Sequence, residues 1–129
     1  MKYLLALILM YSNSLAAQKN NMMIRIAEIE IDAHYTKAYQ EILQEEASTS
    51  VRVEPGVIAI YPLYQKDNPT QVRILEIYAN REAYEAHLKT AHFLKYKTST
   101  QAMVKSLKLV EMENIDAAGM SEIFRKMKP

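Results

Sequence analysis

The sequence predicts an α+β domain of the ferredoxin-like type, in which strands and helices follow one another as βαββαβ. Segments with the two-residue period of a strand alternate with segments that have the longer period of a helix. The length of 129 residues suits one domain with helices packed on one sheet. Pro62 lies inside the second predicted strand, which therefore belongs at a sheet edge, where this topology places it.

The first half of the domain contains a strand, a helix and the start of a hairpin. Residues 24–31 (IRIAEIEI) alternate apolar and polar side chains, which is typical of a half-buried strand. From about residue 35 to residue 50, apolar and aromatic residues recur three and four positions apart, which predicts an amphipathic helix. The turn Glu54-Pro55-Gly56 follows, and residues 57–65 (VIAIYPLYQ) form the second strand.

The second half completes the hairpin and adds two helical pieces. A turn at residues 66–69 joins the second strand to a third strand at residues 71–79. Asn80 and Thr90 are suitable N-cap residues for two helical pieces that reach about residues 89 and 106.

A fourth strand at residues 107–112 closes the sheet. We therefore expect the domain to span residues 22–113. The C-terminal extension at residues 114–129 carries apolar residues at spacings that allow a short helix.

The N-terminus has the layout of a secretory signal peptide. One lysine comes first, an apolar run follows at residues 3–11 (YLLALILMY), and small residues precede the cleavage site that we place after Ala16. The run is shorter than the stretch of about 20 residues that spans a bilayer. We therefore expect residues 1–16 to be removed and the protein to be exported, periplasmic or secreted, without a membrane anchor. Translation from Met22 or Met23 would instead give a cytoplasmic protein.

The composition excludes several classes of site and partner. The chain has no cysteine, so it has no disulfide, thiolate metal site or cysteine nucleophile. Without residues 1–16, which contain one lysine and no acid, 15 basic residues face 15 acidic residues. The sequence contains no basic run or repeat. We therefore expect no nucleic-acid partner and no binding to an anionic membrane surface.

Strand and helix periodicity place several polar side chains on facing surfaces. Glu76 and Tyr78 are two positions apart on the third strand, so they share one face. Tyr84 and His87 share a stripe of the following helix. If that stripe packs on that face, a carboxylate, two phenols and an imidazole converge on a pocket, with His92 at its mouth.

The histidines also allow structural interpretations. His87 could be a buried histidine that only hydrogen-bonds Glu76, and His92 could be a structural residue at the start of a helix. His34 belongs to the solvated start of the first helix. No metal site is expected, because residues five apart on a continuous helix are turned by about 140° and no third ligand is evident.

The segment from Glu76 to Tyr96 resembles the antibiotic biosynthesis monooxygenase domain family. The family motif is a Glu, an aromatic residue two positions later, a helical His, and a T-x-H segment before an aromatic or apolar residue. The matching residues here are EIY at 76–78, YEAHL at 84–88 and TAHF at 90–93. The similarity is greatest to the quinol-monooxygenase-like members, whose usual form is EAHL-x-T-P-H. It covers about residues 22–113.

The resemblance implies a dimeric α+β barrel, in which two four-stranded sheets pack face to face. Each subunit keeps a cavity between its own sheet and its helices. The apolar sheet face that carries Leu75 and Ile77 would then contact the second copy. Members oxidise phenolic or quinol-like compounds with molecular oxygen and no cofactor. We therefore expect a homodimeric oxidoreductase, a cofactor-independent monooxygenase of a small aromatic compound.

The resemblance also implies roles for individual residues. His87 would be the catalytic base or hydrogen-bond donor, since an imidazole exchanges protons at neutral pH. Glu76 would orient a donor or a pocket water. The residues expected to contact substrate are Ile74, Tyr78, Tyr84, His92 and Tyr96.

Several positions depart from the family pattern. Ile29 and Lys97 stand where the haem-degrading branch has an asparagine and its haem-ligating histidine, so haem cleavage is not expected. Tyr78 replaces a tryptophan, Ala91 replaces the proline of T-P-H, and Ile74 replaces a polar amide of some oxygenating members. Two other functions stay open: a non-catalytic domain that binds a small ligand, and an isomerase of a small carbonyl compound.

Overall fold

The structure, a computed structural model, describes residues 21–127, so the expected signal peptide lies outside the described residues. The elements run in the order β1 (Met23–Ile31), η1 (Ala33–Tyr35), α2 (Thr36–Val53), β2 (Val57–Gln65), β3 (Asn68–Tyr78), α3 (Arg81–His87), α4 (Ala91–Thr100), β4 (Val104–Met112), η2 (Ala117–Gly119) and α5 (Met120–Arg125). The strands form one antiparallel sheet in the order β2-β3-β1-β4. The predicted α+β ferredoxin-like βαββαβ fold is confirmed.

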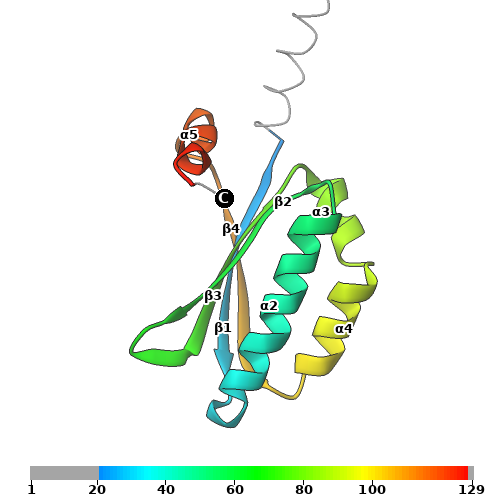
Figure 1. Ribbon diagram of the computed structural model, residues 1–129, viewed down its shortest axis with the longest axis vertical. Helices are drawn as coiled ribbons and strands as arrows, with labels where there is room; N and C mark the ends of the chain where they lie inside the picture. Colours follow the sequence, from blue (N-terminus) through cyan, green and yellow to red (C-terminus); the bar gives the residue numbers. More distant parts are fainter. Residues whose placement is uncertain (1–20, 128–129) are drawn as a thin grey trace, which may run out of the picture.

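The domain has two layers. Figure 1 shows α2 and α4 side by side on the same face of the sheet, with α3 at one end of this layer and α5 beyond the opposite side of the sheet. A hydrogen bond of 2.5 Å between the hydroxyl groups of Tyr39 on α2 and Tyr96 on α4 joins the two long helices. Pro62 lies on the edge strand β2, as its missing N–H predicts.

The core lies between the helices and the inward face of the sheet. In β1, one of the two central strands, every second residue from Met23 to Ile31 is buried, as the two-residue period requires. Val72, Ile74 and Tyr78 of β3 point to the same side and are also buried. They pack against the apolar stripe of α2, which includes Tyr39, Leu43 and Ala47.

Two boundaries differ from the sequence predictions. The hairpin turn is shorter than expected and β3 begins at Asn68, because Gln65 already pairs with that residue. Pro69 is tolerated there, since the pairing of β1 with β3 goes only as far as Gln71. Helix α4 ends at Thr100 and not near residue 106, because β4 starts at Val104, which pairs with Ile31.

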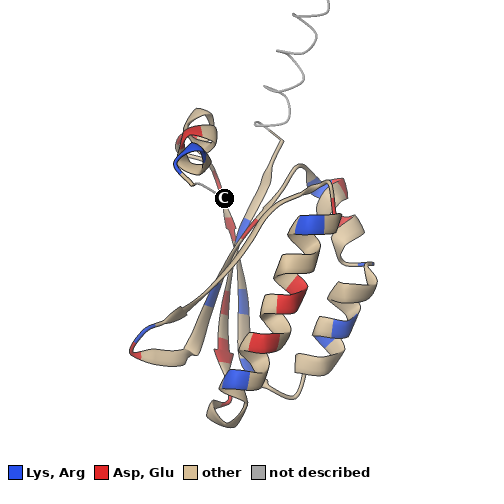
Figure 2. Ribbon diagram, viewed as in Figure 1, with Lys and Arg blue, Asp and Glu red and all other residues tan. Residues whose placement is uncertain are grey.

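The C-terminal extension leaves the sheet after β4 and forms η2 and the short helix α5. Ile123, Phe124 and Met127 of this segment are exposed. Within residues 21–127, no helix is long and apolar enough to cross a membrane. In Figure 2 the positions of basic and acidic residues are interspersed along the helices and strands of the same range.

Gly56 brings the turn after α2 into close contact with α3. A backbone hydrogen bond links the turn to the end of β3, since the Ala79 N–H donates to the Gly56 carbonyl at 2.8 Å. A Cβ atom on Gly56 would lie 2.4 Å from the Cβ of Ala83. The turn that carries Glu54 can therefore approach α3 only with a glycine at this position.

We expect Gly56→Ala to destabilise the protein by roughly 1–3 kcal/mol, the usual cost of overpacking a close contact. Urea denaturation measures this change in the free energy of unfolding. Gly119→Ala is the comparison at the other glycine, since its added Cβ would meet the exposed Asp116 side chain and no backbone of another element. Moving that side chain aside costs only the hydrogen bond of 3.1 Å that it accepts from the Gly119 N–H. Equal stability of Gly56→Ala and the wild type would contradict the close packing of the turn on α3.

Candidate functional site

A cavity of about 530 Å³ lies between the inward face of the sheet and helices α3 and α4. This volume is in the range that holds small organic ligands. Leu107 and Leu109 of β4 form part of its wall, and both remain exposed although they share the inward face with Ile29 and Ala27. The helices lie over the other strands, so the cavity is open to solvent along β4.

The cavity contains most of the residues that the sequence analysis assigned to a pocket. Those that line it are Ile74, Glu76, Tyr84, His87 and Tyr96. Tyr78 and His92 do not line it. Tyr78 is fully buried below the wall, and His92 lies on the side of His87 that faces Glu54.

His87 is held between two carboxylates and is 2% exposed. Its Nδ1 lies 2.8 Å from Oε2 of Glu54, and its Nε2 lies 3.4 Å from Oε1 of Glu46. Glu46 lines the cavity and Glu54 does not, so Nε2 is the ring nitrogen on the cavity side. The contact with Glu54 assigns the proton to Nδ1. Nε2 is then a lone-pair acceptor beside the cavity. The partner that the structural interpretation assigned to His87, Glu76, is not the one observed.

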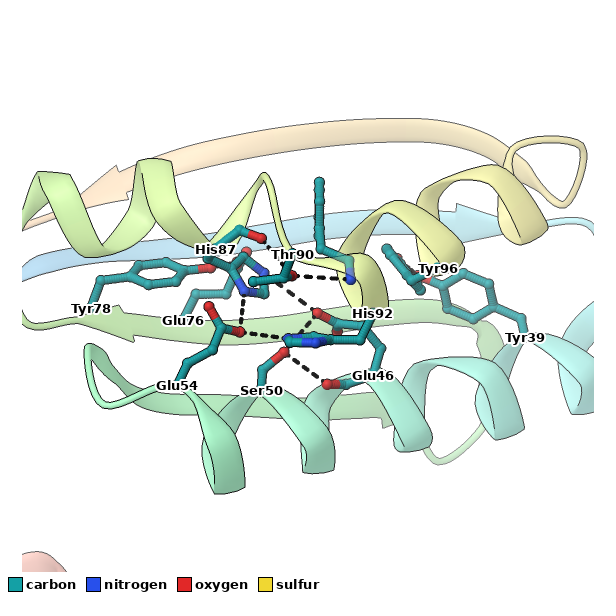
Figure 3. A network of polar contacts seen from close by, with 11 residues as sticks. Tyr39, Glu46, Ser50, Glu54, Glu76, Tyr78, His87, Thr90, His92 and Tyr96 are labelled. Atoms are coloured by element: carbon teal, nitrogen blue, oxygen red, sulfur yellow. Dashed lines mark hydrogen bonds and ion pairs between the residues drawn. The ribbon is translucent and has the colours of Figure 1, made fainter.

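The second histidine converges on the same carboxylate. His92 Nε2 lies 2.7 Å from Oε2 of Glu54, the oxygen that His87 also contacts. The chain can make this turn because α3 ends at His87 and Thr90 caps α4 by accepting from the N–H of Phe93. Figure 3 shows the Glu54 carboxylate between the two imidazoles, with Glu46 and Ser50 on α2 nearby.

The pKa values of the two carboxyl groups that flank His87 are shifted in opposite directions. Burial raises the pKa of Glu46 above its ordinary value, against the opposing charge of His87 and the hydrogen bond from Ser50. Burial alone would also raise the pKa of Glu54, but the hydrogen bonds from His87 and His92 outweigh it and hold this pKa below its ordinary value. Glu54 is therefore the stable anion of the pair that flanks His87.

Glu76 and Tyr78 form a second polar pair next to the histidine. The Tyr78 hydroxyl donates to Oε1 of Glu76 at 2.6 Å. The Tyr78 ring lies 5.5 Å from the His87 ring and 5.3 Å from the Tyr84 ring, between centroids, and so supports both from below. Burial raises the pKa of Glu76, although the hydrogen bond from Tyr78 and the charge of Arg25 oppose this shift.

Arg25 and Lys97 are basic residues that line the cavity, and Arg25 is the one held next to Tyr84. Its side chain bonds Glu111 on the neighbouring strand and donates from Nη1 to the Tyr84 hydroxyl at 2.7 Å. The guanidinium also lies 4.4 Å from the centre of the Tyr84 ring, within the range of a cation–π contact. At the other end of the cavity, burial raises the pKa of Tyr96 to about 12, so this phenol stays neutral and acts only through hydrogen bonds.

Sequence reasoning missed Arg25, Glu46 and Glu54 as site residues. Arg25 lies four positions before the buried Ile29, so strand periodicity places both on the inward face. The inward face was hard to recognise from the sequence, because β1 has apolar residues on both faces. Glu46 lies three positions from Leu43 on the buried stripe of α2, which also could have identified it. Glu54 gave no local signal, because its partners are 33 and 38 positions away.

The cluster of Glu54, His87 and His92 also changes the assessment of metal binding. A metal site was not expected from two histidines on one continuous helix without a third ligand. In the structure the two histidines stand on either side of a helix break, and Glu54 offers the third ligand atom. These three side chains can therefore hold a metal ion behind the cavity wall, whereas the largely apolar lining of the cavity itself suits an organic ligand.

Comparison with known proteins identifies the class to which this fold and cavity belong. The profile of the family described as antibiotic biosynthesis monooxygenase matches residues 22–99. No curated protein matches the chain. The chain belongs to the antibiotic biosynthesis monooxygenase family, and this membership makes it a candidate monooxygenase without specifying its substrate.

Solved structures support the same assignment. A candidate antibiotic biosynthesis monooxygenase from Bacteroides thetaiotaomicron VPI-5482 is 41% identical with a TM-score of 0.75, over 76% of this chain and 93% of that one. A candidate monooxygenase from Lactobacillus acidophilus NCFM is 31% identical with a TM-score of 0.71, over 73% of this chain and 45% of that one. A third, a candidate antibiotic biosynthesis monooxygenase from Nitrosomonas europaea, is 26% identical with a TM-score of 0.70, over 74% of this chain and 92% of that one.

The raised pKa of Glu76 predicts how its replacement changes stability with pH. An ionised carboxyl group at this buried position costs folding free energy. The contribution of Glu76 is therefore most favourable below its unfolded pKa near 4.5 and is lost as pH rises through the raised folded value. We expect Glu76→Gln, which keeps an acceptor for Tyr78, to gain stability relative to the wild type between about pH 4.5 and pH 8.

Urea denaturation at both ends of this range measures the difference. Glu113→Gln, on an exposed side chain, controls for the removal of one negative charge. If the difference between Glu76→Gln and the wild type were the same at both pH values, the raised pKa of Glu76 would be refuted.

Proposed function

We propose that this chain is a cofactor-independent monooxygenase that oxidises a small phenolic or quinol-like compound with molecular oxygen. The observation that carries the proposal is the placement of His87. One ring nitrogen is anchored on Glu54, and the other lies at the wall of a cavity large enough for an aromatic ring. This is the arrangement that a general base needs, since its orientation and tautomer are fixed before the substrate binds.

In the first step, the substrate hydroxyl gives its proton to Nε2 of His87. The Glu54 carboxylate stabilises the imidazolium that forms, because Nδ1 donates to it at 2.8 Å. Tyr84 and Tyr96 contact the aromatic ring within the cavity, and Arg25 places a positive charge where the substrate anion develops. Glu76, whose pKa is raised by burial, is suited to donate a hydrogen bond to a second oxygen of the substrate.

The electron-rich substrate anion then reacts with oxygen. For a hydroquinone, one oxygen atom enters the ring to give a hydroxyquinone, and the other leaves as water. The substrate loses four electrons, its two hydroxyl hydrogens and one ring hydrogen, and a new hydroxyl group takes the place of that ring hydrogen. One of the three released hydrogens ends in the new hydroxyl group, and the other two form the water with the second oxygen atom. All four electrons that reduce oxygen come from the substrate, so no reductant is required.

The expected result is oxygen consumption by the purified protein with at least one member of a panel of hydroquinones. His87→Ala should reduce the rate by about 10²- to 10⁴-fold, the usual contribution of a general base. An oxygen electrode measures both. His34→Ala is the matched control, because His34 is exposed, pairs with Asp32 and does not line the cavity.

The absence of oxygen uptake with the whole panel would contradict the proposal, as would full activity in His87→Ala. Turnover of a small carbonyl compound under anaerobic conditions would instead identify an isomerase. A compound that binds and is recovered unchanged would identify a binding domain.

We further propose that the protein is a homodimer and acts outside the cytoplasm. Export is supported by the sequence of residues 1–16 alone.

The dimer is supported by the sheet face turned away from the helices, called here the outer face. Strand pairing puts on this face Ile24, Ile26, Tyr61, Leu63, Leu75, Ile77, Val110 and Met112. Tyr61 is 61% exposed, which is typical of a residue that a partner covers.

Tyr61→Lys is expected to convert a dimer into a monomer, since it places a charge in the apolar interface. Tyr64→Lys is the matched control, because Tyr64 lies on the same strand, is also exposed, and pairs with Val72 on the inward face. Light scattering gives the mass of each variant. A monomeric wild type, or a dimer that survives Tyr61→Lys but not Tyr64→Lys, would argue against an interface on the outer face.

A further inference from the structure

Three side chains from separate elements meet on the side of His87 that faces away from the cavity. Glu54 follows α2, His87 ends α3, and His92 lies in the first turn of α4. Their ligand atoms all lie within 4.8 Å of one another. We propose that Glu54, His87 and His92 form a binding site for a divalent transition-metal ion such as zinc. This site goes beyond the proposed function and does not depend on it.

The donor atoms are the ones that zinc prefers. Two imidazole nitrogens and one carboxylate leave a fourth position open, a ligand set that occurs in three-ligand zinc sites. His87 Nδ1 and His92 Nε2 already point at the same oxygen of Glu54, from 2.8 Å and 2.7 Å. Zinc lies about 2.0–2.2 Å from such ligands, so ligand atoms around it are separated by roughly 3.3 Å. Each nitrogen would therefore need to move about half an ångström away from the Glu54 oxygen. The two nitrogens, which lie within 4.8 Å of each other, would need to take the same spacing.

The surroundings of the cluster also suit a cation. Metal-bound histidines usually donate their other ring N–H to a carboxylate, and Oε1 of Glu46 lies 3.4 Å from Nε2 of His87. Ser50 fixes that carboxylate by donating to the same oxygen at 3.0 Å. Within residues 21–127, the ion-pair partners of Glu54 are the two histidines, and neither lysine nor arginine neutralises it.

The site is accessible without passing through the cavity. The His92 side chain is 20% exposed and the Glu54 side chain is 12% exposed, whereas the His87 side chain lies behind them and is 3% exposed. Binding through Nδ1 moves the proton of neutral His87 to Nε2, the nitrogen beside the cavity. A bound metal would therefore oppose the proton transfer proposed above and would act as an inhibitor, not as a cofactor.

The test is isothermal titration calorimetry of the full chain with ZnCl2, after treatment with EDTA and dialysis, on protein made without a polyhistidine tag. We expect one zinc ion per chain, with affinity at least about tenfold weaker in His92→Gln and in Glu54→Gln. Glu54→Gln preserves the size and a hydrogen-bond acceptor, so its fold should survive. Thermal melts with and without ZnCl2 check that each variant is folded, and zinc should raise the melting temperature of the wild type most.

His34→Gln is the matched control, because His34 and Asp32 form a histidine–carboxylate pair at 2.9 Å on the exposed surface. Its zinc affinity should equal that of the wild type. The metal site would be disproved by a wild type that binds no zinc. It would also be disproved by binding that the folded Glu54→Gln protein retains in full, or by binding that only His34→Gln weakens. None of these results depends on oxygen consumption, so the monooxygenase proposal stands or falls separately.

Discussion

One oxygen atom of Glu54 joins the parts of the chain that build the cavity wall. It accepts from His87 at the end of α3 and from His92 at the start of α4, and Glu54 itself belongs to the turn between α2 and β2. This contact fixes the break between the two short helices and the orientation of the buried imidazole. It requires the turn to lie close to α3, which is why a glycine is needed at position 56. The cavity therefore depends on a polar contact at its back as much as on its apolar walls.

The same contact separates the roles of the carboxylates. Glu54 remains the anion because two histidines donate to it, whereas burial favours the protonated forms of Glu46 and Glu76. The Nδ1 of His87 then lies close to the ionised Glu54 carboxylate, at 2.8 Å. Its Nε2 lies 3.4 Å from Glu46, on the cavity side. A histidine in that position can take a proton from a hydroxyl group in the cavity. The geometry that orients it also presents two nitrogens and one oxygen to a cation on the far side.

Local periodicity predicted the fold and about half of the site. The parity of β3 put Ile74, Glu76 and Tyr78 on the inward face, and helix spacing put Tyr84 and His87 opposite them, as the structure shows. The break at Thr90 was also visible as an N-cap. The direction of the His92 side chain could not be predicted. It depends on the orientation of α4 after the break and on a contact with Glu54, which lies 38 residues earlier in the chain. Long-range contacts of this kind leave no periodic trace in the chain, and Glu54 was predicted only as part of a turn.

The most direct measurement of the central claim is a crystal structure with a hydroxyaromatic compound that oxygen does not oxidise. The account predicts the ring in the cavity between α4 and β4, with its hydroxyl oxygen hydrogen-bonded to Nε2 of His87 while Nδ1 remains on Glu54. A ring bound elsewhere on the molecule would contradict the account. A ring in the cavity whose hydroxyl group makes no contact with His87, or a His87 turned away from Glu54, would contradict it equally.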